Sequence, residues 1–265
     1  MMRELTMDEL RNVQMQILDE VHEFCQKNKL RYSLAGGTLL GAIRHKGYIP
    51  WDDDIDIMML RKDYDYLIKH FTAQHSGYSI FHHKSERNNY PFLFSKLSLN
   101  NTKLSNGRLK GVGINIDIFP IDSLGNGKLT SKLRFNTMKL LNAVVRLQRS
   151  KKTFCDRWLD TAYSSLQNTA NRIPTLYLLS LIEKLCVQSV NSSKGYSVSI
   201  GSRYLDKEYT SSTLYESYRK YQFEDREYWC ISSYDQYLSM MYGDYMQIPK
   251  DQDKETHNNV GFLPT

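Results

Sequence analysis

Residues 47–59 read Gly-Tyr-Ile-Pro-Trp-Asp-Asp-Asp-Ile-Asp-Ile-Met-Met, and this stretch decides the fold. Four carboxylates lie within the five positions from Asp52 to Asp56, and they lead directly into an apolar run. Side chains of a strand alternate between its two faces, so Asp54 and Asp56 share one face while the neighbouring isoleucines point into a core. Carboxylates this close repel one another unless a cation lies between them. The stretch therefore predicts a strand that carries Mg²⁺ or Mn²⁺, because these ions prefer oxygen ligands; a solvated acidic turn is the alternative.

The residues just upstream predict a phosphate-binding turn. Segment 30–35 alternates like a strand, Gly36 and Gly37 interrupt it, and a short helix runs from Thr38 to Arg44. Small residues at such a turn let phosphate oxygens approach backbone N–H groups, and a helix N-terminus favours negative charge. We therefore expect Gly36, Gly37 and Thr38 to hold phosphate oxygens.

A second acidic strand is expected at 112–119, where Asp117 lies between two isoleucines, as Asp56 does. A charged side chain in an apolar strand is costly unless it is paired or bound to a metal. If the two strands adjoin, Asp54, Asp56 and Asp117 form a carboxylate triad for one or two metal ions. The alternative is that Asp117 caps a loop or pairs with a basic residue.

The rest of the chain alternates between helical and strand patterns. Apolar residues at helical spacing predict helices at 7–28 (with Thr6 and Glu9 as a capping box), 62–74, 129–150, 176–190 and 234–242. Apolar alternation predicts further strands at 55–60, 78–82, 91–99 and 196–200. The polar segment from Lys250 onward is expected to be irregular.

Composition and charge bound the class of protein. The chain has 265 residues, of which 41% are hydrophobic, so it can bury a core. No apolar run approaches the roughly 20 residues of a membrane span, and the N-terminus lacks the apolar stretch of a signal peptide, so we expect a cytoplasmic protein. The net charge of +6 favours anionic partners, among which nucleic acid, acidic membrane and phosphorylated substrates all qualify.

Three segments resemble one known family, in that family's order. The first is the long run 34–57, the second is Ile-Asp-Ile-Phe-Pro-Ile-Asp at 116–122, and the third lies at 237–246, where Tyr-Leu is followed by Tyr-Gly-Asp-Tyr-Met. These motifs resemble those of the LicD family of nucleotidyltransferase-fold proteins. Segment 124–233 has no motif that matches.

The resemblance implies an α/β (α+β) fold, with a nucleotidyltransferase-like mixed sheet flanked by helices and a helical, tyrosine-rich C-terminal part. We expect residues 1–125 to form the catalytic core. Residues 126–265 are expected to complete the substrate site and to pack with the core as one unit.

The same resemblance implies an enzyme that uses a cytidine diphosphate donor. The best-known activity transfers phosphocholine from CDP-choline to a sugar hydroxyl of a bacterial surface glycan precursor (lipopolysaccharide, teichoic acid or capsule) and releases CMP. Relatives move glycerol phosphate or ribitol phosphate, so CDP-glycerol and CDP-ribitol are alternative donors. The catalytic acids of the family match Asp54, Asp56 and Asp117, and its glycine-rich turn matches Gly36, Gly37 and Thr38.

Four basic residues are candidates for contacts with the donor phosphates or the acceptor. Arg44, His45 and Lys46 follow the glycine turn, and a solvated basic turn is their alternative. Lys96 lies among apolar neighbours in an expected strand, where a surface lysine with a packed stem is equally compatible. A choline headgroup would need an aromatic cage, for which Tyr48, Trp51, Trp229 and the C-terminal tyrosines are candidates.

The expected helix at 129–150 carries five basic residues, which could dock on an anionic inner leaflet where a lipid-linked acceptor lies. An ordinary cationic helix face is the alternative. A non-catalytic basic module that binds membrane or nucleic acid is a third interpretation. It leaves the acidic cluster unexplained, because those carboxylates would repel a phosphate backbone, so we expect no nucleic-acid partner.

Overall fold

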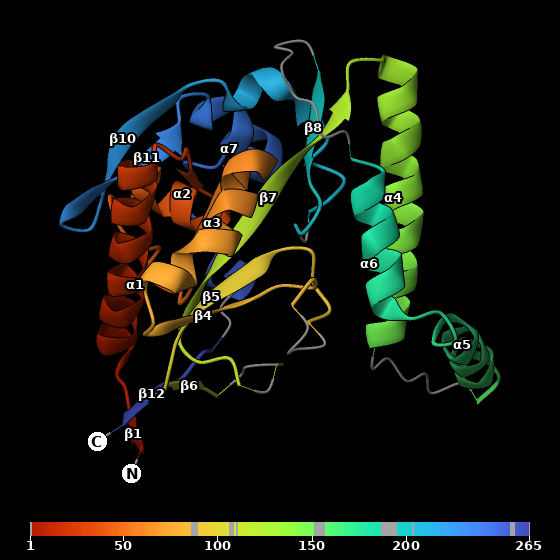
Figure 1. Cartoon of the computed structure of the whole chain (residues 1–265), viewed down its shortest axis with the longest axis horizontal. Helices are drawn as coiled ribbons and strands as arrows, with labels where there is room; N and C mark the ends of the chain where they lie inside the picture. The colour runs from red at the N-terminus through yellow and green to blue at the C-terminus, as the bar shows by residue number, and fades with distance from the viewer. Residues whose placement is uncertain are drawn as a thin grey trace.

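The computed structural model describes residues 2–85, 90–105, 109, 111–150, 157–186, 195–202, 204–254 and 258–264. At its centre is a seven-stranded mixed sheet with the order β2-β3-β7-β5-β4, in which β8 pairs with β7 and β9 with β8 (Figure 1). Its strands are β2 (Ser33–Leu34), β3 (Asp56–Leu60), β4 (Tyr78–Phe81), β5 (Ser95–Leu99), β7 (Asn115–Gly125), β8 (Tyr196–Ser199) and β9 (Thr210–Ser211). Strands β3 and β7 run parallel, and the other described pairs of this sheet are antiparallel. The predicted mixed sheet is confirmed.

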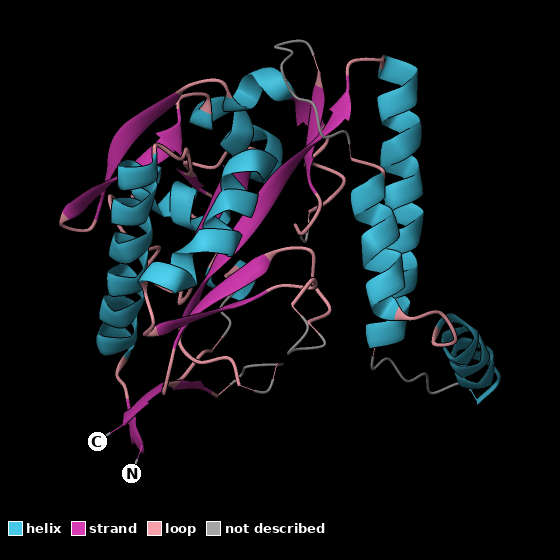
Figure 2. Ribbon diagram, in the orientation of Figure 1, coloured by secondary structure: helices cyan, strands magenta, loops and turns pink. Residues whose placement is uncertain are grey.

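Helices flank the sheet as predicted, and a further helix at Arg157–Ala170 was not expected from the sequence (Figure 2). They are α1 (Met7–Asn28), α2 (Gly36–Arg44), α3 (Arg61–Gln74), α4 (Lys128–Arg149), α5 (Arg157–Ala170), α6 (Thr175–Lys184) and α7 (Tyr234–Tyr242). The capping box of α1 is present, because the Glu9 N–H donates to Thr6 Oγ1 at 3.2 Å and the Thr6 N–H donates to Glu9 Oε2 at 2.9 Å. The expected helix at 176–190 is confirmed over α6, and its last four residues lie outside the described part.

Two large hydrophobic clusters form most of the interior, and a small third one contains Phe81, Tyr90 and Val112. The larger one joins α1, α2, α3 and α7 to the sheet, with Ile55 and Ile57 fully buried in it as the strand alternation predicts. The second joins α4 and α6 to β8 and to the end of β7, through side chains such as Phe135, Leu179 and Val198. In Figure 1, α4 and α6 lie side by side on the far side of the sheet from α1.

Strand β7 differs from its expected range of 112–119, because it begins at Asn115 and continues to Gly125. Pro120 lies inside it, although proline cannot donate a ladder hydrogen bond. The Asp117 N–H donates to Ile55 O at 2.9 Å, so the nitrogen of Pro120 faces the opposite edge of β7. On that edge the pairing with β5 ends at residue 118 and the pairing with β8 begins at residue 121. The proline therefore falls where no N–H is required, and the strand continues through it.

The expectation of an irregular segment after Lys250 is wrong. Strand β12 (Gly261–Pro264) pairs with β1 (Met2–Glu4) and β6 (Lys103–Leu104), which brings the two ends of the chain together (Figure 1). A hairpin of β10 (Tyr218–Phe223) and β11 (Arg226–Ile231) was also not anticipated. The short strands give too few residues for a periodic pattern. The division of the chain near residue 125 stays a prediction.

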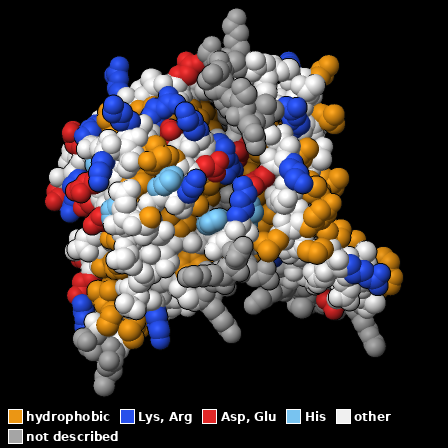
Figure 3. Space-filling view, in the orientation of Figure 1, with side chains coloured by type: hydrophobic (Ala, Val, Ile, Leu, Met, Phe, Trp, Pro, Cys, Tyr) orange, Lys and Arg blue, Asp and Glu red, His pale blue; other side chains and the backbone are white. Residues whose placement is uncertain are grey.

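A charged network joins α6 to the sheet. Arg61 at the start of α3 donates two hydrogen bonds of 2.7 Å to the buried carboxylate of Asp122 on β7. Glu183 of α6 lies 3.4 Å from the same guanidinium, 3.2 Å from His83 Nε2 and 2.7 Å from Lys84 Nζ. Figure 3 shows such basic, acidic and histidine side chains gathered in the seam between the sheet and the α4–α6 layer. The network therefore fixes α6 against the catalytic side of the sheet.

Replacing Glu183 with Gln should destabilise the protein at pH 7 by about 1–3 kcal/mol, because the negative charge that faces Arg61, His83 and Lys84 is removed. Burial raises the pKa of Glu183, but the hydrogen bond and charge of His83, with Lys84 and Arg61, lower it to about 2. The carboxylate therefore contributes stability above its ordinary pKa of 4.5, and this contribution is lost as the pH falls toward 2. Urea unfolding of both proteins between pH 7 and pH 3 measures it.

Asp65→Asn is the matched control, because Asp65 pairs with the same Arg61 but is 57% exposed. We expect a change within about 0.5 kcal/mol for this variant. A Glu183→Gln effect that stays constant between pH 7 and pH 3 would contradict the assigned role of the ionised carboxylate.

Candidate active site

The pairing of β3 with β7 brings the predicted carboxylates together. Asp56 on β3 is directly opposite Asp117 on β7, and Asp54 precedes β3 on the same side. All three line one cleft of about 1280 Å³. The prediction that the two acidic strands adjoin is confirmed, whereas the chemical roles of the three aspartates stay predictions.

Glycines at the start of α2 allow these carboxylates to approach the backbone closely. Gly36 has a left-handed φ of +51°, and a Cβ on it would lie 3.2 Å from Asp56 Oδ2. A Cβ on Gly37 would lie 2.7 Å from Asp52 Oδ2, so a larger residue would displace that carboxylate. Both glycines line the cleft.

Thr38 has a different neighbour from the one expected. Its side chain is buried, and its Oγ1 accepts a hydrogen bond of 2.9 Å from the N–H of Asp56. The hydroxyl therefore anchors the first residue of β3. A direct contact of this side chain with phosphate is not supported by its position.

The acidic loop before β3 is held from two sides. Asp53 is fully buried and faces away from the cleft; its Oδ2 accepts the N–H of Asn259 at 2.6 Å, and its carbonyl accepts from Gln14 Nε2 at 2.9 Å. Arg11 of α1 donates to the carbonyl of Asp52 at 2.6 Å. These bonds join the loop to α1 and to the C-terminal segment.

Lys96 contacts Asp117. It lies opposite Asp117 in the β5–β7 pairing, and its Nζ donates to the Asp117 carboxylate and, at 3.1 Å, to Asn115 Oδ1. The Lys96 Nζ also lies 5.5 Å from the centre of the Phe94 ring. Asp117 was interpreted either as a member of a carboxylate triad or as the partner of a basic residue. In the structure it lies beside another carboxylate and is also the partner of a lysine.

Electrostatic repulsion is concentrated on Asp56. Burial raises the pKa of Asp56 well above its ordinary value, and the charges of Asp54, Asp117 and Asp52 raise it further, in that order. Lys96 acts in the opposite direction but does not compensate. The site therefore carries more negative charge than its own residues neutralise.

The donor set fits a hard divalent cation in part. Oxygen ligands from several aspartates are the chemistry that Mg²⁺ and Mn²⁺ require, and the repulsion on Asp56 would be relieved by a bound cation. As the side chains stand, no three His, Cys, Asp or Glu residues of the described part converge closely enough to hold a metal ion by themselves. Mg²⁺ commonly uses one or two carboxylates and completes its shell with substrate phosphates and water.

The basic residues that follow the glycine turn do not all lie at the cleft. Arg44 lines the cleft, where its guanidinium donates to the carbonyls of Tyr245 at 2.7 Å and Gln247 at 3.2 Å. His45 and Lys46 are not among the described residues that line the cleft. Burial and the charge of Arg44 lower the pKa of His45, and Lys46 has a left-handed backbone with φ of 63°.

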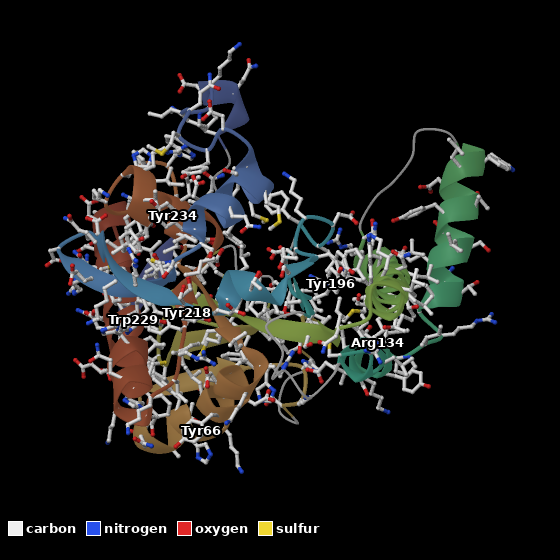
Figure 4. The ribbon with its side chains drawn as sticks, turned by 90° about the horizontal axis from the view of Figure 1, so that it is seen from above. Tyr66, Arg134, Tyr196, Tyr218, Trp229 and Tyr234 are labelled. Carbon is white, nitrogen blue, oxygen red and sulfur yellow. The ribbon has the colours of Figure 1, made fainter. Side chains whose placement is uncertain are left out.

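Three aromatic candidates for a headgroup cage, Tyr48, Trp51 and Trp229, lie in different places and do not form one cage. Tyr48 is buried and donates to Gln14 Oε1 at 3.2 Å. Trp229 lies on the hairpin beside Tyr218, on the opposite side of the molecule from Arg134 of α4 (Figure 4). Trp51 lines the cleft, but Lys254 Nζ already lies 4.4 Å from the centre of its ring.

The cleft wall includes further residues. Arg146 and Arg149 of α4 and Glu208, between β8 and β9, had no role in the expected site. Tyr204, between the same strands, and Tyr237 and Tyr242 of α7 are among the C-terminal tyrosines considered for a headgroup cage. The two α7 tyrosines lie in the third motif, which offered a signal. The arginines had been interpreted as part of a membrane-facing helix, and Glu208 falls in the segment without any motif.

Comparisons with known proteins agree with this geometry. Residues 29–159 match the family described as LicD/FKTN/FKRP, nucleotidyltransferase domain. The chain is 30% identical to the lipopolysaccharide cholinephosphotransferase LicD of Haemophilus influenzae over 97% of each chain. It is also 40% identical to an uncharacterized protein of Rickettsia typhi, over 26% of this chain and 23% of that protein.

Replacing Lys96 with Met should destabilise the protein by about 1–3 kcal/mol without divalent cations, because Asp117 would then face Asp56 without a counter-charge. Millimolar Mg²⁺ should restore part of this loss. Thermal unfolding with Mg²⁺ or with a chelator measures the effect.

Lys139→Met is the matched control, since Lys139 pairs with Asp206 at the surface and both side chains are more than 40% exposed. The unfolding temperature of that variant should change by the same amount in Mg²⁺ and in chelator. The same equal response from Lys96→Met would show that the acidic cluster does not attract a divalent cation.

Proposed function

The chain belongs to the LicD family, and on that premise we propose that it transfers phosphocholine from CDP-choline to a sugar hydroxyl of a bacterial surface glycan precursor and releases CMP. The observation that carries the proposal is the parallel pairing that sets Asp56 beside Asp117, at the edge of the cleft where α2 begins. A transferase that handles a diphosphate needs negative ligands for a cation and backbone donors for phosphate oxygens, and both occur at this point.

Each part of the cleft has a proposed role in this reaction. Backbone N–H groups at the start of α2 would bind phosphate oxygens of the donor, with help from the helix dipole. Mg²⁺ or Mn²⁺ held by Asp54, Asp56 and Asp117 would neutralise the donor diphosphate and stabilise the charge on the leaving CMP. Arg146 and Arg149, on the α4 side of the cleft, are suited to an anionic group of the acceptor.

Lys96 and Asp117 would act in sequence. The Lys96 ammonium now contacts the Asp117 carboxylate. A donor diphosphate in the cleft would compete for that ammonium, because its two phosphates each carry a negative charge and offer several acceptor oxygens. Asp117 would then accept the proton of the acceptor hydroxyl as that oxygen attacks phosphorus.

Glycerol phosphate and ribitol phosphate transfer use the same diphosphate chemistry, so the aspartates do not separate these donors from CDP-choline. The part of the cleft that holds the headgroup must do so. A basic module without catalysis is disfavoured, because four aspartates at the cleft would oppose an anionic polymer. A cytoplasmic location stays a prediction; no helix of the described residues is long and apolar enough to cross a bilayer.

Contact with an anionic membrane also stays a proposal, and the structure changes which side chains would carry it. Among the basic residues of α4, Lys139 pairs with Asp206, Lys132 lies over the rings of Phe135 and Tyr209, and Arg146 and Arg149 line the cleft. The exposed side of α4 instead presents Leu129, Leu133 and Leu140, which are 86%, 68% and 67% exposed. Insertion of these leucines into a headgroup layer would bury apolar area that water now covers.

Asp56→Asn should reduce CMP formation from CDP-choline by at least about 100-fold, because the cation that would neutralise the donor diphosphate loses one of its proposed ligands. CMP is measured with Mg²⁺, with Mn²⁺ and with chelator, in the presence of a lipopolysaccharide acceptor. CDP-glycerol and CDP-ribitol are run in parallel, and Asp206→Asn is the surface control. Faster CMP formation from CDP-glycerol or CDP-ribitol would show that choline is not the transferred headgroup. Equal activity in chelator would contradict the metal requirement.

The double variant Leu133→Glu, Leu140→Glu should lose binding to vesicles that contain anionic lipid, while CMP formation from soluble acceptor stays unchanged. Both side chains are exposed, so the stability should change little. Vesicle pelleting at low and high salt measures binding, and vesicles of neutral lipid provide the reference. If the unaltered protein stays in the supernatant with every vesicle, the membrane proposal is wrong.

A further inference from the structure

Glu208 is a buried carboxylate that the mechanism above does not use. It lies between β8 and β9, is 3% exposed, and lines the same cleft as the aspartates. Ser202 and Tyr237 form hydrogen bonds with its carboxyl group, but its Oε2 has no hydrogen-bond partner among the described residues. No described lysine, arginine or histidine forms an ion pair with it. A buried acid in this state is costly unless something else occupies the site.

Burial raises the pKa of Glu208 to about 7, and the hydrogen bonds from Ser202 and Tyr237 offset only part of that effect. The group therefore changes its charge near neutrality. A cation that entered this corner would find a carboxylate whose ionised form it could stabilise.

The surroundings of Glu208 are aromatic. Tyr204, Tyr237 and Tyr242 line this part of the cleft, and the rings of Tyr204 and Tyr242 lie 6.3 Å apart at 80°. Aromatic faces attract cations through the negative charge of the ring face, most strongly when water is excluded. The combination of aromatic rings with a buried carboxylate suits a cation that has no N–H to donate.

This corner adjoins the phosphate turn. A hydrogen bond joins Tyr237 to the backbone of Gly36, and a Cβ on Gly36 would lie 3.7 Å from the Tyr242 hydroxyl and 3.2 Å from Asp56 Oδ2. Tyr242 is close enough to both acids that the charges of Asp56 and Glu208 each raise its pKa, after burial. A group attached to a phosphate at the start of α2 can therefore reach Glu208.

We propose that Glu208, with the rings of Tyr204 and Tyr242, forms the subsite for the quaternary ammonium of the transferred phosphocholine. The inference rests on the proposed function and names the residues that select its donor. Trp51 is a less suitable site, because the Lys254 ammonium lies 4.4 Å from its ring centre, whereas Lys207 Nζ lies 5.6 Å from the ring centre of Tyr204. Glycerol and ribitol headgroups are uncharged and rich in hydroxyls, so they would gain little from a buried carboxylate among rings.

Calorimetric titration of the full chain with CDP-glycerol and with CDP-choline, in Mg²⁺, tests the subsite. The ratio of the two affinities isolates the headgroup, because both ligands have the same nucleotide and the same doubly esterified diphosphate. We expect CDP-choline to bind the unaltered protein about tenfold more tightly than CDP-glycerol, and Glu208→Gln to abolish this difference while the CDP-glycerol affinity stays unchanged. Glu216→Gln, an exposed acid nearby in the chain, should retain the full difference.

The outcomes separate the two proposals. If the unaltered protein prefers CDP-choline and Glu208→Gln keeps that preference, the subsite inference is wrong and the donor assignment stands. If the unaltered protein binds CDP-choline no better than CDP-glycerol, the subsite and the choline donor are both wrong. Tyr204→Leu is the second variant, since Tyr204 is only partly buried; it should reduce the same ratio, which keeps the test decisive if Glu208→Gln does not fold.

The affinity ratio should also rise with pH through about 7 in the unaltered protein and stay flat in Glu208→Gln. Below that pH the carboxyl group is protonated and must lose its proton before the ammonium gains a partner. The other titratable groups near it are Tyr215, Tyr237 and Tyr242, whose pKa values burial raises above 10, so they stay neutral in this range. A ratio that is constant between pH 6 and pH 8 would contradict the role of the carboxylate.

Discussion

The parallel pairing of β3 and β7 is the constraint on which the site depends. A parallel pair cannot be joined by a tight turn, so the chain must leave β3, form α3 and the β4–β5 hairpin, and return to lay β7 beside β3. That return sets Asp56 and Asp117 side by side, which is unfavourable for two carboxylates in a buried setting. This electrostatic repulsion lies at the point where a charged substrate and its cation would be bound, and Lys96 compensates only part of it.

Local patterns in the sequence predicted the elements that have a clear periodicity. Helical spacing located α1, α2, α3, α4, α6 and α7, and the interleaving of aspartate with isoleucine located the two acidic strands. Helix α5 was missed, and so were segments whose extent depends on strands that are distant in the sequence. The second half of β7 is stabilised by β8, some 75 residues later, and the short β12 exists only because β1 and β6 lie on either side of it. A pattern of four or five residues carries no information about a partner strand that lies far away in the sequence.

For the site, too, the residues that lie within local motifs were predicted and the others were not. Asp54, Asp56, Asp117, Gly36 and Gly37 lie within motifs, and all five line the cleft. Glu208 lies between Lys207 and Tyr209 and outside any motif, and only the fold reveals that it is buried beside other tyrosines. Arg146 and Arg149 were assigned to the outside of a basic helix, because spacing shows that a helix carries charge but not which of its faces meets a neighbour.

The hydrogen bond between Asp53 and Asn259 has a consequence for synthesis of the chain. The acidic loop and the residue that holds it are separated by more than two hundred positions, so during translation the loop is made early and its support arrives late. A nascent chain can form α1 and the first strands while the loop still lacks this bond. The loop gains this bond only after residue 259 has left the ribosome, so until then the carboxylates beside Asp53 lack one of the supports that hold them at the cleft.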